Sequence, residues 1–242
     1  MNGTANADRV LADLRSATDE LLGHAASLSD REVREASLLP GWTRGHVLTH
    51  LARNAEGSTR LLIWARTGIP SYEYESLEAR ATAIEAGSGR PAGVLAADVR
   101  RTAAAFAEAA TDMPPEAWQR VVRYAGGQEP RAEVIVPSRL AEVLIHHVDL
   151  DVGFGPRDWP APFVADMLSL VADGLGRRDG MTAIRLAATD SGRDVAIGTV
   201  ALAGITVRGP EPELLAWLLG RSDGRALGRE PDGPLPGVPA VY

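Results

Sequence analysis

The residues best suited to chemistry in this chain are its histidines, most of which fall into two clusters. His46 and His50 stand four positions apart, and Glu142 stands four positions before His146. On a helix, this spacing puts two side chains on one face, about 5–6 Å apart at Cβ. Two such side chains can bind one metal ion. The five histidines are His24, His46, His50, His146 and His147.

The two clusters together match the ligand requirement of a catalytic zinc site. Such a site uses three protein ligands and leaves one position open. Glu142 and His146 supply two ligands from one helix, and one histidine of the other helix completes a His2Glu set. Periodicity alone leaves open whether His46 or His50 points inward, although the neighbouring Leu51 places His50 close to an apolar stripe.

Simpler interpretations of the same residues also stand. An i, i+4 histidine pair is common on a partly exposed helix surface, and Glu142 is also a suitable local partner for His146. Asp149, three positions after His146, either orients a ligand or holds a helix end. The spacing does not choose between these roles.

The composition excludes several kinds of chemistry. The chain has no cysteine, and all 25 of its basic residues are arginines. It therefore has no disulfide, thiol nucleophile or cysteine-based metal site, and no lysine for a Schiff base or a P-loop. A formal net charge of −7 argues against nucleic acid and anionic membranes as partners. The N-terminus lacks the pattern of a signal peptide and no apolar run is long enough to span a bilayer, which predicts a cytoplasmic protein.

Four long helices are expected to position the candidate ligands. The helix that carries His50 should begin after an N-cap at Thr43 and end before Gly68. The helix that carries Glu142 and His146 should begin at Pro137-Ser138. Four such helices are enough for a four-helix bundle. The predicted helices span residues 5–27, 44–67, 91–112 and 138–152, with a short helix over 30–36, a loop with a short helix over 69–89 and extended pieces over 116–136.

A second domain is expected after the Gly153-Phe154-Gly155-Pro156 segment, where the composition changes. Short strand patterns follow, two of them joined by a Ser191-Gly192 turn, which indicates a small α+β domain. The tail from Gly224 is predicted to be irregular. The other predicted elements are helices over 163–177 and 211–219 and strands over 183–188, 194–197 and 204–207.

Three segments of the chain resemble the mycothiol-dependent maleylpyruvate isomerase family. They are GWTRGHVLTHLARNA (41–55), YESLEARATAIEAGS (74–88) and SRLAEVLIHHVDLDVGF (138–154), and LAGITVRG (202–209) and LLGRSDG (218–224) extend the similarity. The resemblance implies an α+β fold. It implies a DinB-like four-helix bundle that binds metal over residues 1–155, and a small α/β domain over 156–242 that contributes to the active-site cleft.

The resemblance also assigns the site residues. It places the zinc ligands on His50, Glu142 and His146, with a water completing the site, and it gives His46 and His147 no ligand role. Arg80 and Arg221 match arginines of the family pattern and are predicted to be catalytic. Arg221 is the better candidate for binding a substrate carboxylate. A surface salt bridge is the alternative for each arginine.

The implied reaction is the cis–trans isomerisation of maleylpyruvate to fumarylpyruvate, assisted by the small thiol mycothiol. A thiolate can add to the double bond, leave a single bond free to turn, and depart again. Because the chain has no cysteine, the thiol must be borrowed, and zinc or another divalent metal would hold it deprotonated.

Two other functions fit the same residues. One is a mycothiol S-transferase that joins the thiol to another electrophile, and the other is a non-catalytic regulatory module that binds metal. The predicted partners are a small-molecule substrate and a low-molecular-weight thiol, with no nucleic acid and no membrane. The sequence leaves open the electrophile, the metal, the proton donor and the oligomeric state.

Overall fold

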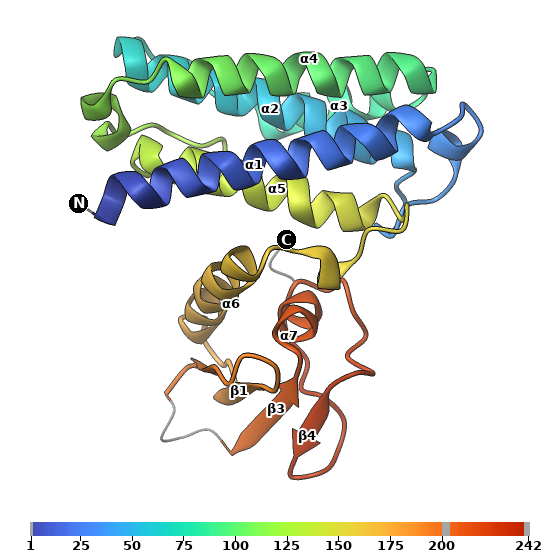
Figure 1. The fold of residues 1–242 in the computed structure, drawn as a ribbon, viewed down its shortest axis with the longest axis vertical. Helices are drawn as coiled ribbons and strands as arrows, with labels where there is room; N and C mark the ends of the chain where they lie inside the picture. Colours follow the sequence, from blue (N-terminus) through green and yellow to red (C-terminus); the bar gives the residue numbers. More distant parts are fainter. Residues whose placement is uncertain (1, 200–203, 240–242) are drawn as a thin grey trace. The chain divides into compact units, whose positions relative to one another are not determined.

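The chain folds into two compact units, residues 1–153 and residues 154–242 (Figure 1). The structure is a computed structural model that describes residues 2–199 and 204–239, with side chains from Asp8 onward. Within the described part of the chain, no helix is both long and apolar enough to cross a membrane. The fold is α+β, with helices alone in the first unit and a small sheet in the second, as the sequence predicts.

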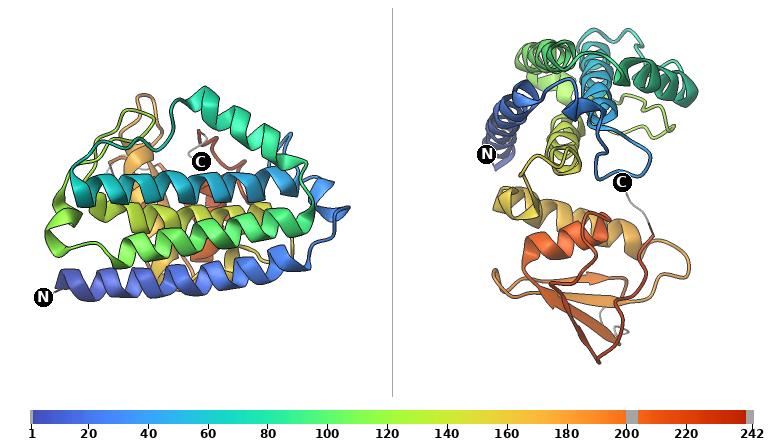
Figure 2. Two further views of the ribbon diagram at one scale, coloured as in Figure 1. Left: turned by 90° about the horizontal axis from the view of Figure 1, so that it is seen from above. Right: turned by 90° about the vertical axis from the view of Figure 1, so that its right-hand side faces the viewer.

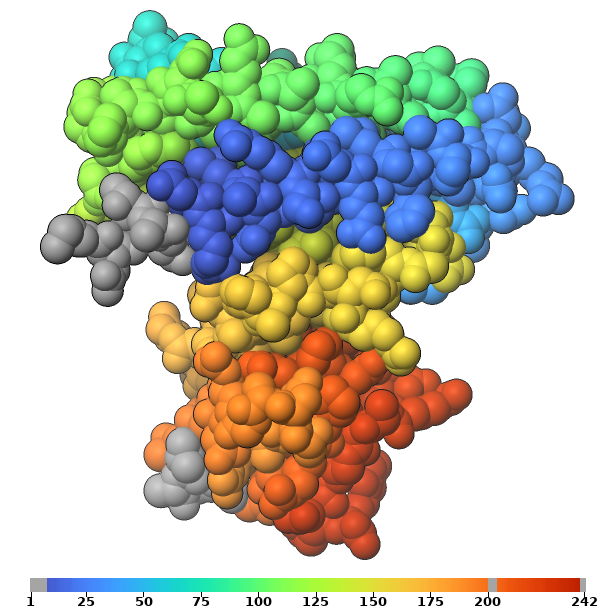
Figure 3. Space-filling view, viewed as in Figure 1, coloured from blue at the N-terminus to red at the C-terminus, as the bar shows by residue number. Residues whose placement is uncertain are grey.

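Four long helices run lengthwise in the first unit (Figure 2). Helix α2 contacts α4 and α5, and α1 contacts the same two helices from the other side. Helices α1 and α4 lie side by side on the face seen in Figure 3. The predicted four-helix bundle is confirmed. Its long helices are α1 (Asn2–Ser27), α2 (Arg44–Thr67), α4 (Ala92–Thr111) and α5 (Ile135–Asp149), and the shorter α3 (Leu77–Ser88) packs on α2.

Helix α2 begins and ends where its capping residues predict. The side chain of Thr43 accepts from the backbone N–H of His46, and the ring Nδ1 of His46 lies 3.1 Å from the backbone N of Thr43. These two contacts satisfy donors that the first helical turn leaves without partners. At the other end, Gly68 adopts φ 77°, a left-handed conformation that suits glycine.

Helix α5 begins earlier than predicted. The sequence suggests a start at Pro137-Ser138, but the helix begins at Ile135, so that Pro137 lies in its first turn. The first turn tolerates proline because its N–H groups have no acceptor within the helix. The helix also ends at Asp149 and not at residue 152.

The segments between the long helices are mostly irregular, as predicted over 116–136, but the helix predicted over 30–36 is shorter than expected. The expected helix over 30–36 is a single 3-10 turn, Glu32–Arg34. The segment over 116–136 contains one isolated bridge between Val121 and Arg131, flanked by two 3-10 turns at Pro115–Gln119 and Ala132–Val134. The predicted helix over 30–36 has only seven residues, and so short a helix is marginal in water.

The second unit packs two helices, α6 (Ala161–Gly176) and α7 (Glu211–Leu218), against a four-stranded sheet (Figure 2). The strand order is β2-β1-β3-β4, with β1 and β3 parallel and both edge strands antiparallel to their neighbours. The turn at Gly192, φ 70°, joins β1 to β2 as predicted. The strands are β1 (Ile184–Ala188), β2 (Asp194–Ile197), β3 (Ile205–Gly209) and β4 (Gly228–Glu230).

Strand β4 corrects the prediction of an irregular tail. Its three residues pair antiparallel with β3, and Arg208 forms an ion pair with Glu230 across the two strands. A strand this short, without alternating apolar residues, carries no periodic signal in the sequence. Residues 200–203, which include the start of the LAGITVRG segment, lie outside the described residues.

Candidate metal centre

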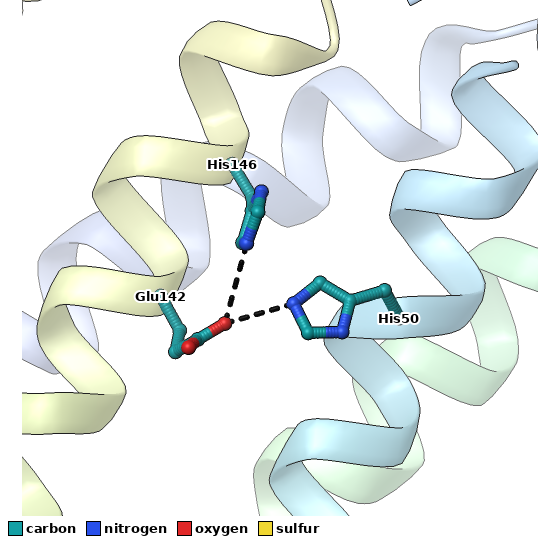
Figure 4. Close-up of side chains that lie close together, drawn as sticks. All are labelled: His50, Glu142 and His146. Atoms are coloured by element: carbon teal, nitrogen blue, oxygen red, sulfur yellow. Dashed lines mark hydrogen bonds and ion pairs between the residues drawn. The ribbon is translucent and has the colours of Figure 1, made fainter. Parts of the chain in front are cut away.

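Three side chains from two helices of the bundle converge on one point (Figure 4). The Nε2 atom of His50 lies 2.8 Å from Oε2 of Glu142, and Nε2 of His146 lies 3.3 Å from the same oxygen. The three possible ligand atoms all lie within 4.8 Å of one another. The two imidazole rings are nearly perpendicular, with an interplanar angle of 85°.

Helices α2 and α5 bring these side chains together because the two helices pack directly against each other. Glu142 and His146 share one face of α5 through their i, i+4 spacing. His50 comes from α2, whose neighbouring residues Val47 and Leu51 are fully buried in the core. The ligand positions are therefore held by the packing of the bundle and not by a loop.

The structure separates the two histidines of α2. His46 lies in the first turn, where its ring caps the helix at Thr43 and its Nε2 lies 3.1 Å from Oε2 of Glu85. His50, one turn further along, is 2% exposed and faces Glu142. The ring of His46 is thus engaged in local structure, and the ring of His50 is the one at the centre.

Burial and mutual contacts set the charge of the three groups. Burial, together with the charge of His146, lowers the pKa of His50 to about 4, so this ring is neutral near pH 7. Burial alone would raise the pKa of Glu142, but contacts with His146 and His50 hold it well below the usual range. The site therefore combines a neutral imidazole with an ionised carboxylate, which are the forms that bind metal.

Asp149 orients the second imidazole. Its Oδ2 accepts a hydrogen bond from Nδ1 of His146 at 2.7 Å, and its side chain is 1% exposed. With a proton held on Nδ1, the neutral ring can present the lone pair of Nε2 to an ion at the site. Burial would lower the pKa of His146, but its contacts with Asp149 and Glu142 outweigh that effect and raise it. Of the two roles considered for Asp149, the geometry shows the orienting one.

The two predicted catalytic arginines lie in different units. Arg80, on α3, points its Nη2 at Nδ1 of His50 at 3.0 Å, so it lies next to the candidate ligands. Arg221 lies in the second unit, directly after α7, and its Nη1 donates to the carbonyl of Leu219 at 2.8 Å. The contact of Arg80 with His50 places it at the candidate site and not in a surface salt bridge.

Sequence reasoning missed several polar groups around Glu142. Arg139 lies one turn before Glu142 on α5, is 2% exposed, and donates from Nη1 to Oδ1 of Asn54 at 2.8 Å. Glu73 has its pKa raised by burial, and accepts from the backbone N–H of Ala125 at 3.3 Å. An arginine three positions before Glu142 in an otherwise apolar helix was the available signal for the first. The second lies in a loop without periodicity.

The donor set fits a divalent metal ion. Two imidazole nitrogens and one carboxylate oxygen are borderline ligands that suit Zn²⁺ and other first-row divalent ions. Among the described residues, His50, Glu142 and His146 form the group of this kind that could hold one. Three protein ligands would leave a coordination position for a water or a small molecule.

Comparison with protein families matches both units of the chain. The profile described as "Mycothiol maleylpyruvate isomerase N-terminal domain" matches residues 14–151, and that described as "MDMPI C-terminal domain" matches residues 158–240. No curated protein matches the chain significantly.

Two solved structures match nearly the whole chain. One is a crystal structure of the mycothiol-dependent maleylpyruvate isomerase, with a TM-score of 0.87 and 26% identity. The other is a histidine-to-alanine mutant described by the same name, with a TM-score of 0.88 and 25% identity. Each comparison covers 97% of this chain and 96% of the other chain. The similarity therefore extends over both units.

Proposed function

The chain belongs to the mycothiol maleylpyruvate isomerase family, and from this premise we propose that it is a mycothiol-dependent cis–trans isomerase that converts maleylpyruvate to fumarylpyruvate. The observation that carries the proposal is the convergence of His50, Glu142 and His146 in a fold that matches this enzyme over both units. The predicted family membership is thus confirmed, and substrate and thiol are part of the proposal.

We propose that His50, Glu142 and His146 hold a divalent metal ion, with zinc as the first candidate. A bound divalent ion would supply Lewis acidity that favours the thiolate form of the cosubstrate near neutral pH. The chain's own contribution is to keep His50 neutral by burial and Glu142 ionised by its two histidine contacts. Asp149 fixes the ring of His146 so that Nε2 faces the site.

The lack of cysteine fits a reaction that borrows its thiol. Addition of the thiolate sulfur to one carbon of the double bond forms a C–S bond and moves an electron pair into the conjugated carbonyl as an enolate. The remaining C–C single bond can rotate. The reverse movement of electrons then breaks the C–S bond and restores the double bond, so that no thiol is consumed and no net proton is transferred.

Arginines are the groups that can stabilise the negative charge of this path. Arg80 lies beside His50, where its guanidinium can stabilise an enolate oxygen or bind a carboxylate with two hydrogen bonds. For Arg221, in the second unit, we propose a contact with a substrate carboxylate. The net charge of −7 does not attract an anionic substrate, so local cations must do so.

The direct experiment compares His50→Ala with a matched control, His24→Gln. The native His24 contacts His147, which lies on a different face of α5 from Glu142 and His146. Wild-type protein should contain about one divalent ion per chain and isomerise maleylpyruvate only when mycothiol is added. His50→Ala should lose both metal and activity, and His24→Gln should keep both. Full activity of His50→Ala would exclude the proposed site, and consumption of mycothiol in proportion to product would indicate an S-transferase instead.

A further inference from the structure

Three buried polar atoms near Glu142 lack hydrogen-bond partners among the described residues. They are the hydroxyl oxygens of Tyr74 and Tyr124 and the Nη2 atom of Arg139; Arg80 and Ser138 lie near the two hydroxyls, but none of the three atoms makes a hydrogen bond of normal geometry. Buried polar atoms in native proteins almost always have a partner, because an unmade hydrogen bond is costly. Three such exceptions beside one candidate metal ligand therefore need an explanation.

The two tyrosines are brought together by a bridge between two loops. Glu73, in the loop before α3, accepts from the backbone N–H of Ala125, in the loop before α5, at 3.3 Å. Tyr74 directly follows Glu73, and Tyr124 directly precedes Ala125. The two rings thus enter the same region from two loops.

Helix α2 forms the floor of this region. A Cβ atom at Gly57 would lie 2.7 Å from Cγ of Glu73 and 3.4 Å from Cζ of Tyr74, the carbon that carries the hydroxyl. The absence of a side chain at Gly57 therefore lets the hydroxyl end of Tyr74 approach the helix. Gly57 lies two turns after His50, so the phenol and the candidate metal ligand share one face of α2.

Two guanidinium groups flank the same region. Arg80 lies over the ring of Tyr74, with its Cζ 5.7 Å from the ring centroid, and it also reaches His50. Arg139 uses Nη1 on Asn54 and leaves Nη2 without a partner. The carboxylates facing the region are Glu73 and Glu142, and a third arginine, Arg60, donates to the backbone carbonyl of Glu73, so the region carries more cationic than anionic groups. The charge of a divalent metal would then remain for an anionic ligand to balance.

Both phenols are suited to donate a hydrogen bond. Burial raises the pKa of Tyr74 to about 12 and also raises the pKa of Tyr124. The two hydroxyls consequently remain protonated at any physiological pH. Two O–H donors and an N–H donor together suit the two oxygens of a carboxylate, which offer about four lone-pair sites.

We propose that Tyr74, Tyr124 and Arg139, together with Arg80, bind one carboxylate of the substrate beside the metal ligands. This inference rests on the proposed function, because it assigns these residues to an unsaturated dicarboxylate. Tyr74 and Tyr124 lie on loops between helices, and their hydroxyl oxygens are buried. The unpartnered donors are then a preformed binding set that the substrate completes.

The experiment uses maleate, a simple unsaturated dicarboxylate, as a calorimetric probe of the metal-loaded full chain. Tyr74→Phe and Tyr124→Phe each remove one hydroxyl and keep the ring. A hydrogen bond to a charged group contributes enough that each variant should bind maleate about tenfold more weakly. Their thermal unfolding midpoints should stay close to or exceed that of the wild type, because the hydroxyl that is removed makes no hydrogen bond of normal geometry within the protein.

Tyr72→Phe is the matched control, since Tyr72 lies on the same loop but is 56% exposed. It should bind maleate like the wild type. The proposal is overturned if the wild type does not bind maleate, if Tyr74→Phe and Tyr124→Phe bind it unchanged, or if both variants lose stability in proportion to binding. A failure of the proposed function looks different: tyrosine-dependent binding of maleate would persist in a protein that does not isomerise maleylpyruvate with mycothiol.

Discussion

Replacing Asp149 by asparagine should weaken metal binding without unfolding the bundle. The carboxylate of Asp149 accepts from Nδ1 of His146 at 2.7 Å and is 1% exposed, so solvent and salt screen the contact very little. Asparagine keeps the size of the side chain but removes its charge, and its amide can present N–H to Nδ1. The imidazole then loses the partner that directs the Nε2 lone pair toward the site.

The expected magnitude follows from the type of contact. A hydrogen bond to a charged group is worth about 1.5–3 kcal/mol, and a loss of about 2 kcal/mol corresponds to about thirtyfold in affinity. Competition for zinc against a chromophoric chelator measures this change directly. Thermal unfolding of the chelator-treated variant, followed by circular dichroism, shows whether the fold is retained.

Asp151→Asn is the matched control for this measurement. Asp151 is 59% exposed at its side chain and adopts φ 54°, a conformation that asparagine tolerates well. Its metal affinity should equal that of the wild type. If Asp149→Asn binds zinc as tightly as the wild type while remaining folded, the orienting role of Asp149 is wrong.

Three further predictions concern the same region. Metal affinity should fall as the pH falls through the raised pKa of His146, because protons then compete with the metal for its ring. His50, with a pKa of about 4, should add no pH dependence of its own above pH 5. Zinc titrations from pH 5 to 8 measure this dependence. The Arg80→Gln variant should bind zinc several-fold more tightly but turn over more slowly. Glutamine can accept a hydrogen bond from Nδ1 of His50, whereas the arginine can only donate one. An unchanged zinc affinity in chelator competition would contradict this prediction. The Gly57→Ala variant should raise the KM for substrate several-fold, because the added Cβ pushes Glu73 away from α2. Equal KM values for variant and wild type in steady-state kinetics would argue against a role for this close approach of Glu73 to the helix.

The sequence predicted the elements that carry strong local signals. The two ends of α2 were predicted from Thr43 and Gly68, because helix capping and the left-handed conformation depend on single residues and their neighbours. The pairing of Glu142 with His146 follows from helical spacing alone. By contrast, the start of α5 was misplaced because proline is allowed anywhere in a first turn, and Pro137 does not mark which position it occupies.

The composition of the site depends on tertiary contacts that local patterns do not contain. Spacing could not choose between His46 and His50, and the choice became clear only from the cap that occupies His46 and the helix that faces His50. Tyr74 and Tyr124 carry no periodic signal, since each lies in a loop. The loops that carry them are joined because Glu73 accepts a hydrogen bond from the backbone N–H of Ala125, 52 positions away, a contact that no local rule predicts.

All three candidate ligands come from the helical unit, and they come from two of its helices. An ion held between them would act as a cross-link that exists only while α2 and α5 remain packed, so its binding free energy enters the unfolding equilibrium of that unit by mass action. The melting temperature of the bundle should therefore report the free metal concentration around the protein. A cell that withholds the metal would lower the amount of folded enzyme as well as its catalytic rate.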